Sequence, residues 1–326
     1  MKDKIKNKIS ISFLNKIYAL GGAGTFLENF IKYLEAKNYF IENKICKHTD
    51  YIFILGSSFK NIIKILFFKY FYKSKIITRV DGKNLNYKLS KSIKKKLLAI
   101  LQNFSVFVFQ LISNKIIYQS YYVKKLWINF FFEKKSTVIY NGSKFNYCKR
   151  NYDTKIKPTL LSVEGSIDAA YNSSNLIKTI GHSYNYEIYG SVSPRIVKGF
   201  KNFKNIKFFG PVKRKQILKI LAKRKKYIFI SLEMFAPCPN SVIEAINHGI
   251  PVIGYKQGSM KEIIPDNNGI LLNVSNKLTV NKLELYQSIS KINKNYNFFN
   301  KKLKKINKKF KMEYMLKKYE SEILNT

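Results

Sequence analysis

Residues 231–274 carry the side chains and turns best suited to chemistry in this chain of 326 residues. A buried strand is expected at Ile228–Ser231, and the breaker-rich run 236–241 follows it. Glu244 comes next, about one turn into an expected helix. A carboxylate at this point can accept two ribose hydroxyl groups, as acidic residues do in dinucleotide sites. The spacing therefore predicts a nucleotide-binding carboxylate at Glu244.

Two loop-to-helix junctions flank this carboxylate. Asn240 or Ser241 can cap the first helix, which is expected to begin near Val242. Gly258-Ser259 opens the next turn before a second helical stretch. In a doubly wound sheet such junctions lie at the carboxyl ends of parallel strands, where ligands bind, and helix N-termini favour anions. These junctions therefore predict an anionic ligand.

The order and spacing of Glu244-Ala245, His248–Ile253 and Gly258–Ile263 resemble the donor-binding segment of GT-B glycosyltransferases of family 4, also called group 1. The resemblance implies an α/β chain with two Rossmann-like parallel-sheet domains that face a cleft. It also implies a nucleotide-sugar donor as substrate, retention of anomeric configuration, and neither a metal ion nor a cofactor. The alternative is an ordinary βαβ unit whose glycines and prolines only punctuate turns.

The resemblance assigns donor binding to one loop and two helix starts. The donor-binding residues are Pro239, Asn240, Ser241, Glu244, Gly258 and Ser259. The family usually places a second acid eight positions before the helix carboxylate, where this chain has Ala236. Glu233 lies three residues earlier, and it either contacts the donor sugar or is a solvent-facing residue after a strand. Glu233 is one of two candidate catalytic residues.

A second departure follows the first strand of the C-terminal half. Members of the family place an arginine and then a lysine there to neutralise the donor diphosphate, whereas this chain has Glu164–Asp168. Diphosphate binding would then rest on backbone N–H groups at Pro237–Ser241 and Ser259, or on cations elsewhere. The candidate cations are Arg195, Lys198 and Lys256.

In the N-terminal half, glycines and a turn carboxylate occupy comparable positions. Gly21, Gly22 and Gly24 precede an expected helix, and backbone N–H groups in such a turn can approach a phosphate closely. The resemblance places these glycines at the cleft, as a phosphate or acceptor loop. Asp81 ends an expected strand and is the second candidate catalytic residue, with a plain Asp-Gly turn as the alternative.

The charge balance indicates an anionic partner. Lys and Arg number 60 against 19 Asp and Glu, a net charge of +41. Such a chain is attracted to nucleic acid, anionic lipid or phosphorylated substrates. The sequence contains no recognisable nucleic-acid-binding module, so no specific nucleic acid is expected. Three scattered cysteines and three scattered histidines match no metal spacing. The odd number and wide separation of the cysteines indicate a reducing compartment.

Strand–helix alternation in both halves divides the chain into domains. We expect an acceptor-side N-terminal domain at 1–145, a linker at 146–157 and a nucleotide-sugar-binding domain at 158–285. Residues 286–326 are expected to form basic helices that pack back toward the N-terminal domain.

Two stretches that combine lysines with apolar residues fit a membrane surface. Leu97–Asn114 is uncharged and follows a lysine cluster that ends in Lys94-Lys95-Lys96. Its polar side chains favour a buried helix over a membrane span. Lys301–Lys311 is expected to form a basic amphipathic helix, which fits either a membrane surface or a protein core. The expected location is cytoplasmic, peripheral on the inner face of the cell membrane.

Together these patterns predict a glycosyltransferase that moves a sugar from a nucleotide-sugar to a sugar or lipid-linked acceptor in cell-surface polysaccharide or lipopolysaccharide synthesis. Two alternatives stay open. One is a non-catalytic protein that binds polyanions or membranes on the same fold, which the departures at Ala236 and Glu164–Asp168 favour. The other is a nucleotide-sugar epimerase, which would need more acids and histidines than this chain offers.

Overall fold

The computed structural model describes residues 10–13, 22–56, 61–90, 92–127, 135–168, 170, 173–264, 268–305 and 308–326. The chain forms two compact units. The first takes in the chain as far as Tyr140 together with Tyr314–Thr326, and the second is Asn141–Glu313. Each unit is described by itself below.

The first unit is built on a parallel sheet, whose strand order in the described residues is β2-β1-β3-β4-β5-β6. Its strands are β1 (Ser10–Phe13), β2 (Phe40–Glu42), β3 (Tyr51–Leu55), β4 (Lys75–Val80), β5 (Lys115–Tyr118) and β6 (Ser136–Val138). Short apolar runs between helices produce this arrangement because parallel strands need helical crossovers and are covered on both faces.

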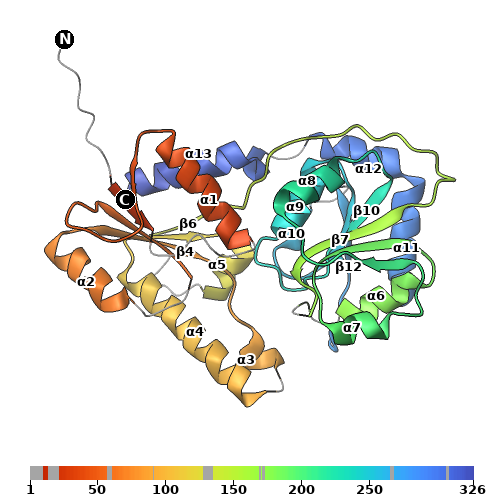
Figure 1. Ribbon diagram of the computed structural model, residues 1–326, viewed down its shortest axis with the longest axis horizontal. Coiled ribbons are helices and arrows are strands. Elements are labelled where there is room, and N and C mark those ends of the chain that lie inside the picture. Colours follow the sequence, from red (N-terminus) through yellow and green to blue (C-terminus); the bar gives the residue numbers. More distant parts are fainter. Residues whose placement is uncertain are drawn as a thin grey trace, which may run out of the picture. The chain divides into compact units, whose positions relative to one another are not determined.

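Alternate residues of β3 point to opposite faces of this sheet. Ile52 and Ile54 pack with Ile65 and Phe68 of α2 (Ile62–Phe71) and with Phe109 of α4 (Ile93–Ile112). The helices α2 and α4 therefore cover one face, as Figure 1 shows. The remaining helices on the path from β4 to β6 are α3 (Asn86–Leu89) and α5 (Tyr121–Trp127).

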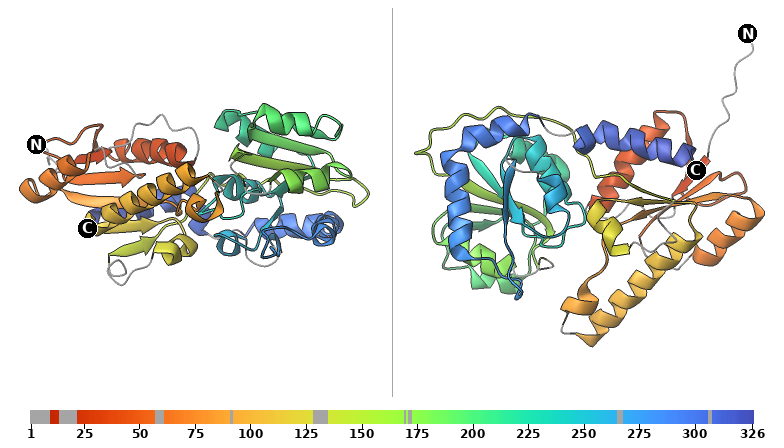
Figure 2. Two further views of the ribbon diagram at one scale, coloured as in Figure 1. Left: turned by 90° about the horizontal axis from the view of Figure 1, so that it is seen from below. Right: turned by 180° about the vertical axis from the view of Figure 1, so that it is seen from behind.

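The other face is covered by α1 (Gly22–Glu35) and α13 (Met312–Leu324), which lie side by side in Figures 1 and 2. Tyr319 of α13 is fully buried, and its ring lies 4.7 Å from that of Phe26, 5.5 Å from Phe30 and 6.2 Å from Phe53. The last helix of the chain thus completes the aromatic core of the first unit.

The second unit has a parallel sheet with the strand order β12-β11-β10-β7-β8-β9. Its strands are β7 (Thr159–Ser166), β8 (Tyr186–Ser191), β9 (Ile206–Phe208), β10 (Tyr227–Ile230), β11 (Val252–Tyr255) and β12 (Gly269–Leu272). Its helices are α6 (Ser173–Gly181), α7 (Pro194–Gly199), α8 (Arg214–Ala222), α9 (Asn240–Asn247), α10 (Met260–Ile263), α11 (Lys282–Lys294) and α12 (Tyr296–Leu303).

The main core of the second unit joins α6 and α11 to the sheet. Ile177 of α6 and Ile289 of α11 are fully buried in one cluster with Ile228 of β10 and with Tyr296 and Phe299 of α12. The helices α11 and α12 are therefore part of the core of the second unit, and only Tyr314–Thr326 belongs to the first.

The predicted fold class, an α/β chain with two Rossmann-like parallel sheets, is confirmed. Two short strands, β2 and β12, escaped the sequence prediction because three or four residues carry little periodic signal. The predicted helix at Lys301–Lys311 is wrong: α12 ends at Leu303, and a separate 3₁₀ turn occupies Lys308–Phe310. Leu303 and Phe310 are buried, so these residues pack on a protein core.

Candidate functional site

Glu244 is buried in the second unit and forms an ion pair. It lies in α9 with 5% of its surface exposed, and its Oε1 is 2.6 Å from a terminal nitrogen of Arg214. Arg214 is the first residue of α8, which packs beside α9. Burial raises the pKa of the Glu244 carboxyl, and the Arg214 guanidinium opposes that rise. Because an ionised carboxylate has acceptor capacity on both oxygens, one arginine contact does not exhaust it.

The helix that carries Glu244 begins earlier than predicted. The predicted start near Val242, with Asn240 or Ser241 as cap, is wrong: α9 starts at Asn240 and Pro239 occupies the N-cap position. Proline has no polar side chain, so it cannot accept from the first N–H groups of the helix. Asn240 and Ser241 are partly exposed in the first turn, where backbone N–H groups favour an anion.

The loop before α9 is fixed by the turn that contains Gly258. Gly258 has a φ of +62°, and a Cβ there would lie 2.8 Å from the carbonyl oxygen of Ala236. Ser259 is fully buried, and both its backbone N–H and its hydroxyl donate to that carbonyl at 3.0 Å. Ala236 is itself fully buried. An acid at this position would therefore be buried as well.

Glu233 and Glu164 form a pair of carboxyl groups beside this loop. The Leu232 N–H donates to Oε1 of Glu164 at 2.9 Å, and the Glu233 N–H also donates to that carboxyl. Burial and the nearby charge of Glu233 raise the pKa of Glu164 to about 8. Burial also raises the pKa of Glu233, which is partly buried. Glu233 is therefore not a simple solvent-facing residue.

An irregularity in the sheet places Glu164 against this loop. The register between β7 and β8 shifts between Val163 and Ser166, as in a β-bulge. Opposite it, Gly190 has a φ of +144°, and a Cβ there would collide with the carbonyl oxygen of Glu164. Bulges often re-aim a side chain next to a functional site. Here Glu164 binds loop N–H groups at the position where the family places an arginine.

Two residues that were not among the predicted site residues hold the same region. Arg214 lies 30 positions before Glu244, so no local pattern links the two. Asn141 is buried, and its side-chain NH₂ donates to the carbonyl oxygen of Cys238 at 2.8 Å. The Asn-Gly dipeptide at Asn141-Gly142, which follows an apolar run, was the available signal for this residue.

In the first unit, Asp81 directly follows β4 and forms polar contacts. Its Oδ1 lies 2.9 Å from a terminal nitrogen of Arg79 and accepts from the side-chain NH₂ of Gln119, which directly follows β5. Arg79 is buried, with its guanidinium carbon 4.3 Å from the ring centre of Phe26 and its Nε donating to the Tyr319 hydroxyl. Asp81 is thus one member of a charged network rather than a bare Asp-Gly turn.

The predicted glycine loop is partly helix. Gly22 and Gly24 lie in the first turn of α1, with Gly22 exposed and Gly24 buried, so the prediction of a loop at these two residues is wrong. Gly21 lies outside the described residues. Because the first N–H groups of a helix have no partner inside it, Gly22 and Gly24 still present donors suited to an anion.

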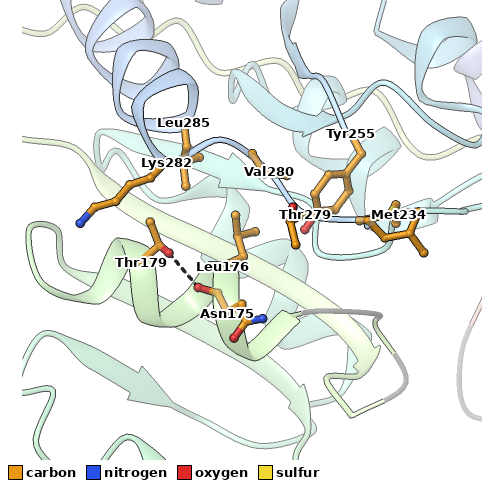
Figure 3. A pocket seen from close by; sticks show the side chains of 10 residues that line it. Asn175, Leu176, Thr179, Met234, Tyr255, Thr279, Val280, Lys282 and Leu285 are labelled. Atoms are coloured by element: carbon orange, nitrogen blue, oxygen red, sulfur yellow. Dashed lines mark hydrogen bonds between the residues drawn. The ribbon is translucent and has the colours of Figure 1, made fainter. Parts of the chain in front are cut away.

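Figure 3 shows a pocket in the second unit, between α6 and α11. It is lined by Asn175, Leu176, Thr179, Met234, Tyr255, Leu278, Thr279, Val280, Lys282 and Leu285. The lining is largely apolar, and the ammonium group of Lys282 points away from the other side chains drawn. None of the predicted site residues lines this pocket, and we assign no function to it.

Comparison with known proteins bears on the fold and on one domain of the chain. Residues 172–295 match the family model described as glycosyl transferases group 1. This match contains Arg214, Glu233, Glu244 and the Gly258 turn. No curated protein gives a significant sequence match.

Several solved structures share the fold over nearly the whole chain. Sucrose-phosphate synthase from Thermosynechococcus elongatus is 11% identical with a TM-score of 0.68, covering 96% of this chain and 98% of that one. HepE from Anabaena, in complex with UDP and glucose, is 12% identical with a TM-score of 0.71, covering 98% and 100%. A glycosyltransferase from Rickettsia africae is 16% identical with a TM-score of 0.62, covering 98% and 100%.

The chain as a whole therefore has the two-domain fold of these solved glycosyltransferases. Within the chain, residues 172–295 match a glycosyl transferase domain of group 1.

Proposed function

We propose that the protein transfers a sugar from a nucleoside-diphosphate sugar, with retention and without a metal ion, to an acceptor used in cell-surface polysaccharide synthesis. In such a reaction the bond between the anomeric carbon and the diphosphate breaks. An acceptor hydroxyl oxygen then bonds to the same carbon and loses its proton, and the nucleoside diphosphate leaves as an anion.

The observation that carries this proposal is the Glu244 site. A buried carboxylate held by Arg214 lies in the first two turns of α9, beside a proline-rich loop within the matched domain. Here Glu244 would accept the ribose hydroxyls, and the first N–H groups of α9 would bind the diphosphate. The complexes of HepE with UDP and with UDP-glucose support uridine nucleotides as the first donors to test.

The remaining predicted residues take supporting roles in the proposal. Asn240 and Ser241 would line the phosphate or sugar, and Pro239 sets the direction of the helix start. Gly258 and Ser259 would act indirectly, since Ser259 is buried behind the carbonyl group of Ala236. Glu233 and Asp81 stay the candidate catalytic residues of the second and first units.

A binding experiment tests the donor site first. Because the net charge of +41 attracts any polyanion, UDP-, GDP- and ADP-sugars should be compared with inorganic pyrophosphate at equal ionic strength. A specific nucleotide should bind more tightly than pyrophosphate. Glu244→Gln should weaken the binding of that nucleotide by about tenfold, which corresponds to the loss of roughly one charge-assisted hydrogen bond. The same substitution should leave the affinity for pyrophosphate unchanged.

The matched control is Glu313→Gln, which changes an exposed carboxyl and should leave nucleotide affinity as it was. Donor hydrolysis or transfer that persists in EDTA would agree with a metal-independent reaction, and the anomeric configuration of the product can be read by NMR. If no sugar nucleotide binds better than pyrophosphate and none is turned over, the enzyme proposal fails and the non-catalytic alternative is preferred.

A further inference from the structure

The outer face of α4 carries a row of exposed apolar side chains along its whole length. Its members are Ile93, Leu97, Ile100, Leu101, Phe104 and Leu111, each between 47% and 75% exposed. Spacings of three and four residues place them on one side of the helix. A helix of 20 residues is about 30 Å long, so this is an extended apolar stripe and not an isolated exposed side chain.

The neighbouring helix α2 extends this surface. Ile63, Phe67, Tyr70 and Phe71 are 46% to 82% exposed, and their spacing again places them on one side. The two helices are joined at one end, where the Lys69 ammonium group donates to the carbonyl oxygen of Ile112 at 2.6 Å. They pack on the same sheet face (Figure 1), and we call their exposed sides together the α2/α4 face.

The charge around the α2/α4 face is almost entirely positive. Residues 51–132 contain 15 Lys and Arg but a single acid, Asp81. Lys64 on α2 and Lys94 and Lys95 at the start of α4 are exposed beside the apolar side chains. An apolar stripe bordered by lysines complements a layer with an anionic surface and a hydrocarbon interior.

We propose that the α2/α4 face binds the surface of an anionic lipid bilayer, with its apolar side chains at the boundary between head groups and acyl chains. This interaction does not depend on the proposed transfer reaction. A second copy of the chain fits the surface poorly, because pairing two such faces would bring Lys64, Lys94 and Lys95 of each copy together.

The helix lies on the bilayer and does not cross it. Among the described residues, α4 is the one helix long and apolar enough to span a membrane by length and composition. Its inner face, however, belongs to the first unit: Ala99, Ser105 and Phe109 are buried, and the Gln110 side chain accepts from the Tyr118 hydroxyl at 2.7 Å. A spanning helix would have to leave these contacts.

Co-sedimentation of the full chain with vesicles tests the proposal, using phosphatidylglycerol mixed with phosphatidylcholine and phosphatidylcholine alone as probes. Binding should require the anionic lipid. Lys94→Gln with Lys95→Gln should lower the partition coefficient roughly 10- to 30-fold, at about 1 kcal/mol for each lysine near the surface. At high salt the charged contribution is screened and the apolar contribution remains. There, Leu97→Ser with Leu101→Ser should lower the partition coefficient more than the lysine substitutions do.

Matched controls lie in the second unit, which is equally rich in lysine. Lys301→Gln with Lys302→Gln, and Leu283→Ser with Phe298→Ser, change exposed residues of α11 and α12. These variants should bind vesicles as the unchanged chain does. Equal losses from both sets would overturn the proposal and leave only unspecific attraction of a basic chain.

Hydrogen–deuterium exchange on the unchanged chain gives a second measurement that needs no variant. Peptides covering α2 and the first half of α4 should become protected when vesicles are added. Protection of other peptides instead would overturn the proposal. A concentration-dependent dimer that Leu101→Ser dissociates would also overturn it, and would show that a second copy of the chain occupies the face.

Discussion

At the scale of single residues, the pair Arg214–Glu244 determines the electrostatics of the candidate site. The carboxylate is 7% exposed in its side chain and the guanidinium 28%, so water screens this pair only in part. Removing one partner of such a pair leaves a charge with little solvation, whereas removing both can cost little.

We therefore expect Arg214→Met to lower the free energy of unfolding by about 2–3 kcal/mol. The double variant Arg214→Met with Glu244→Gln should recover much of that loss. Chemical denaturation of the four members of this cycle gives the coupling energy directly. A double variant as unstable as the sum of the single variants would show that the two groups do not interact.

Glu164 predicts a pH dependence of stability. Its pKa is raised from an ordinary value of 4.5 to about 8 in the folded chain, so the folded state binds more protons between these values. The stability that this group contributes is fully present below pH 4.5 and is lost as pH rises through about 8. Glu164→Gln cannot ionise and should flatten the fall of Tm between about pH 5 and about pH 8.

The exposed Glu35→Gln serves as the control and should leave the slope of Tm against pH unchanged. If Glu164→Gln and the unchanged chain lose stability in parallel over this range, the Glu164 carboxyl is ionised throughout and the assignment is wrong.

The sequence predicted those site residues that have a local signature. Glu244 follows a breaker-rich loop at helical spacing, and Gly258 is a glycine where a close approach of two chain segments demands one. Arg214 and Glu164 could not be predicted as partners of this site. Arg214 meets Glu244 only through the packing of α8 on α9, and Glu164 reaches its loop only through an irregular sheet register.

At the scale of elements, α13 contributes most to the first unit through one side chain. Tyr319 packs among three aromatic rings, and its hydroxyl accepts from Arg79 at 3.1 Å. Tyr33 and Tyr39 both donate to the Glu320 carboxylate of the same helix. Tyr319 thus makes both apolar and polar contacts, and Glu320 adds two hydrogen bonds.

Tyr319→Ala should destabilise the first unit by about 3–5 kcal/mol, as expected for removing a fully buried aromatic side chain. Tyr319→Phe keeps the ring and loses one hydrogen bond to a charged group, so its cost should be about 1.5–3 kcal/mol. Thermal unfolding followed by near-ultraviolet circular dichroism measures both. Equal costs for the two variants would show that the hydroxyl, not the ring, holds the helix.

Sequence patterns predicted the type of an element well where the periodicity extended over many residues. They predicted poorly which face of an element is exposed. The uncharged stretch Leu97–Asn114 was correctly expected to be helical, and α4 ends within it at Ile112. The expectation that this helix is buried is wrong, because half of its surface faces outward with apolar side chains. Hydrophobicity alone cannot distinguish a face that packs on the sheet from one that binds another surface.

At the scale of the whole molecule, the excess of positive charge acts on stability. A net charge of +41 in 326 residues produces repulsion that destabilises the compact state more than the unfolded chain.

Raising sodium chloride from about 20 mM to about 200 mM shortens the screening length to below about 10 Å and should raise Tm. Differential scanning fluorimetry checks this, with an equal osmolality of sucrose as the control. A fall in Tm on adding salt would mean that attractive pairs outweigh the repulsion.

The division of the chain into units has a consequence for its synthesis. The first unit begins before Tyr140 and is completed by Tyr314–Thr326, so the ribosome makes all of Asn141–Glu313 in between. While that middle portion emerges and folds, Phe26, Phe30 and Phe53 lack the ring that covers them. The nascent chain thus exposes an aromatic surface until Tyr319 has been made, and a premature stop at codon 314 would make that exposure permanent. A product truncated there should therefore be a substrate for chaperones and proteases, although it keeps all of Asn141–Glu313.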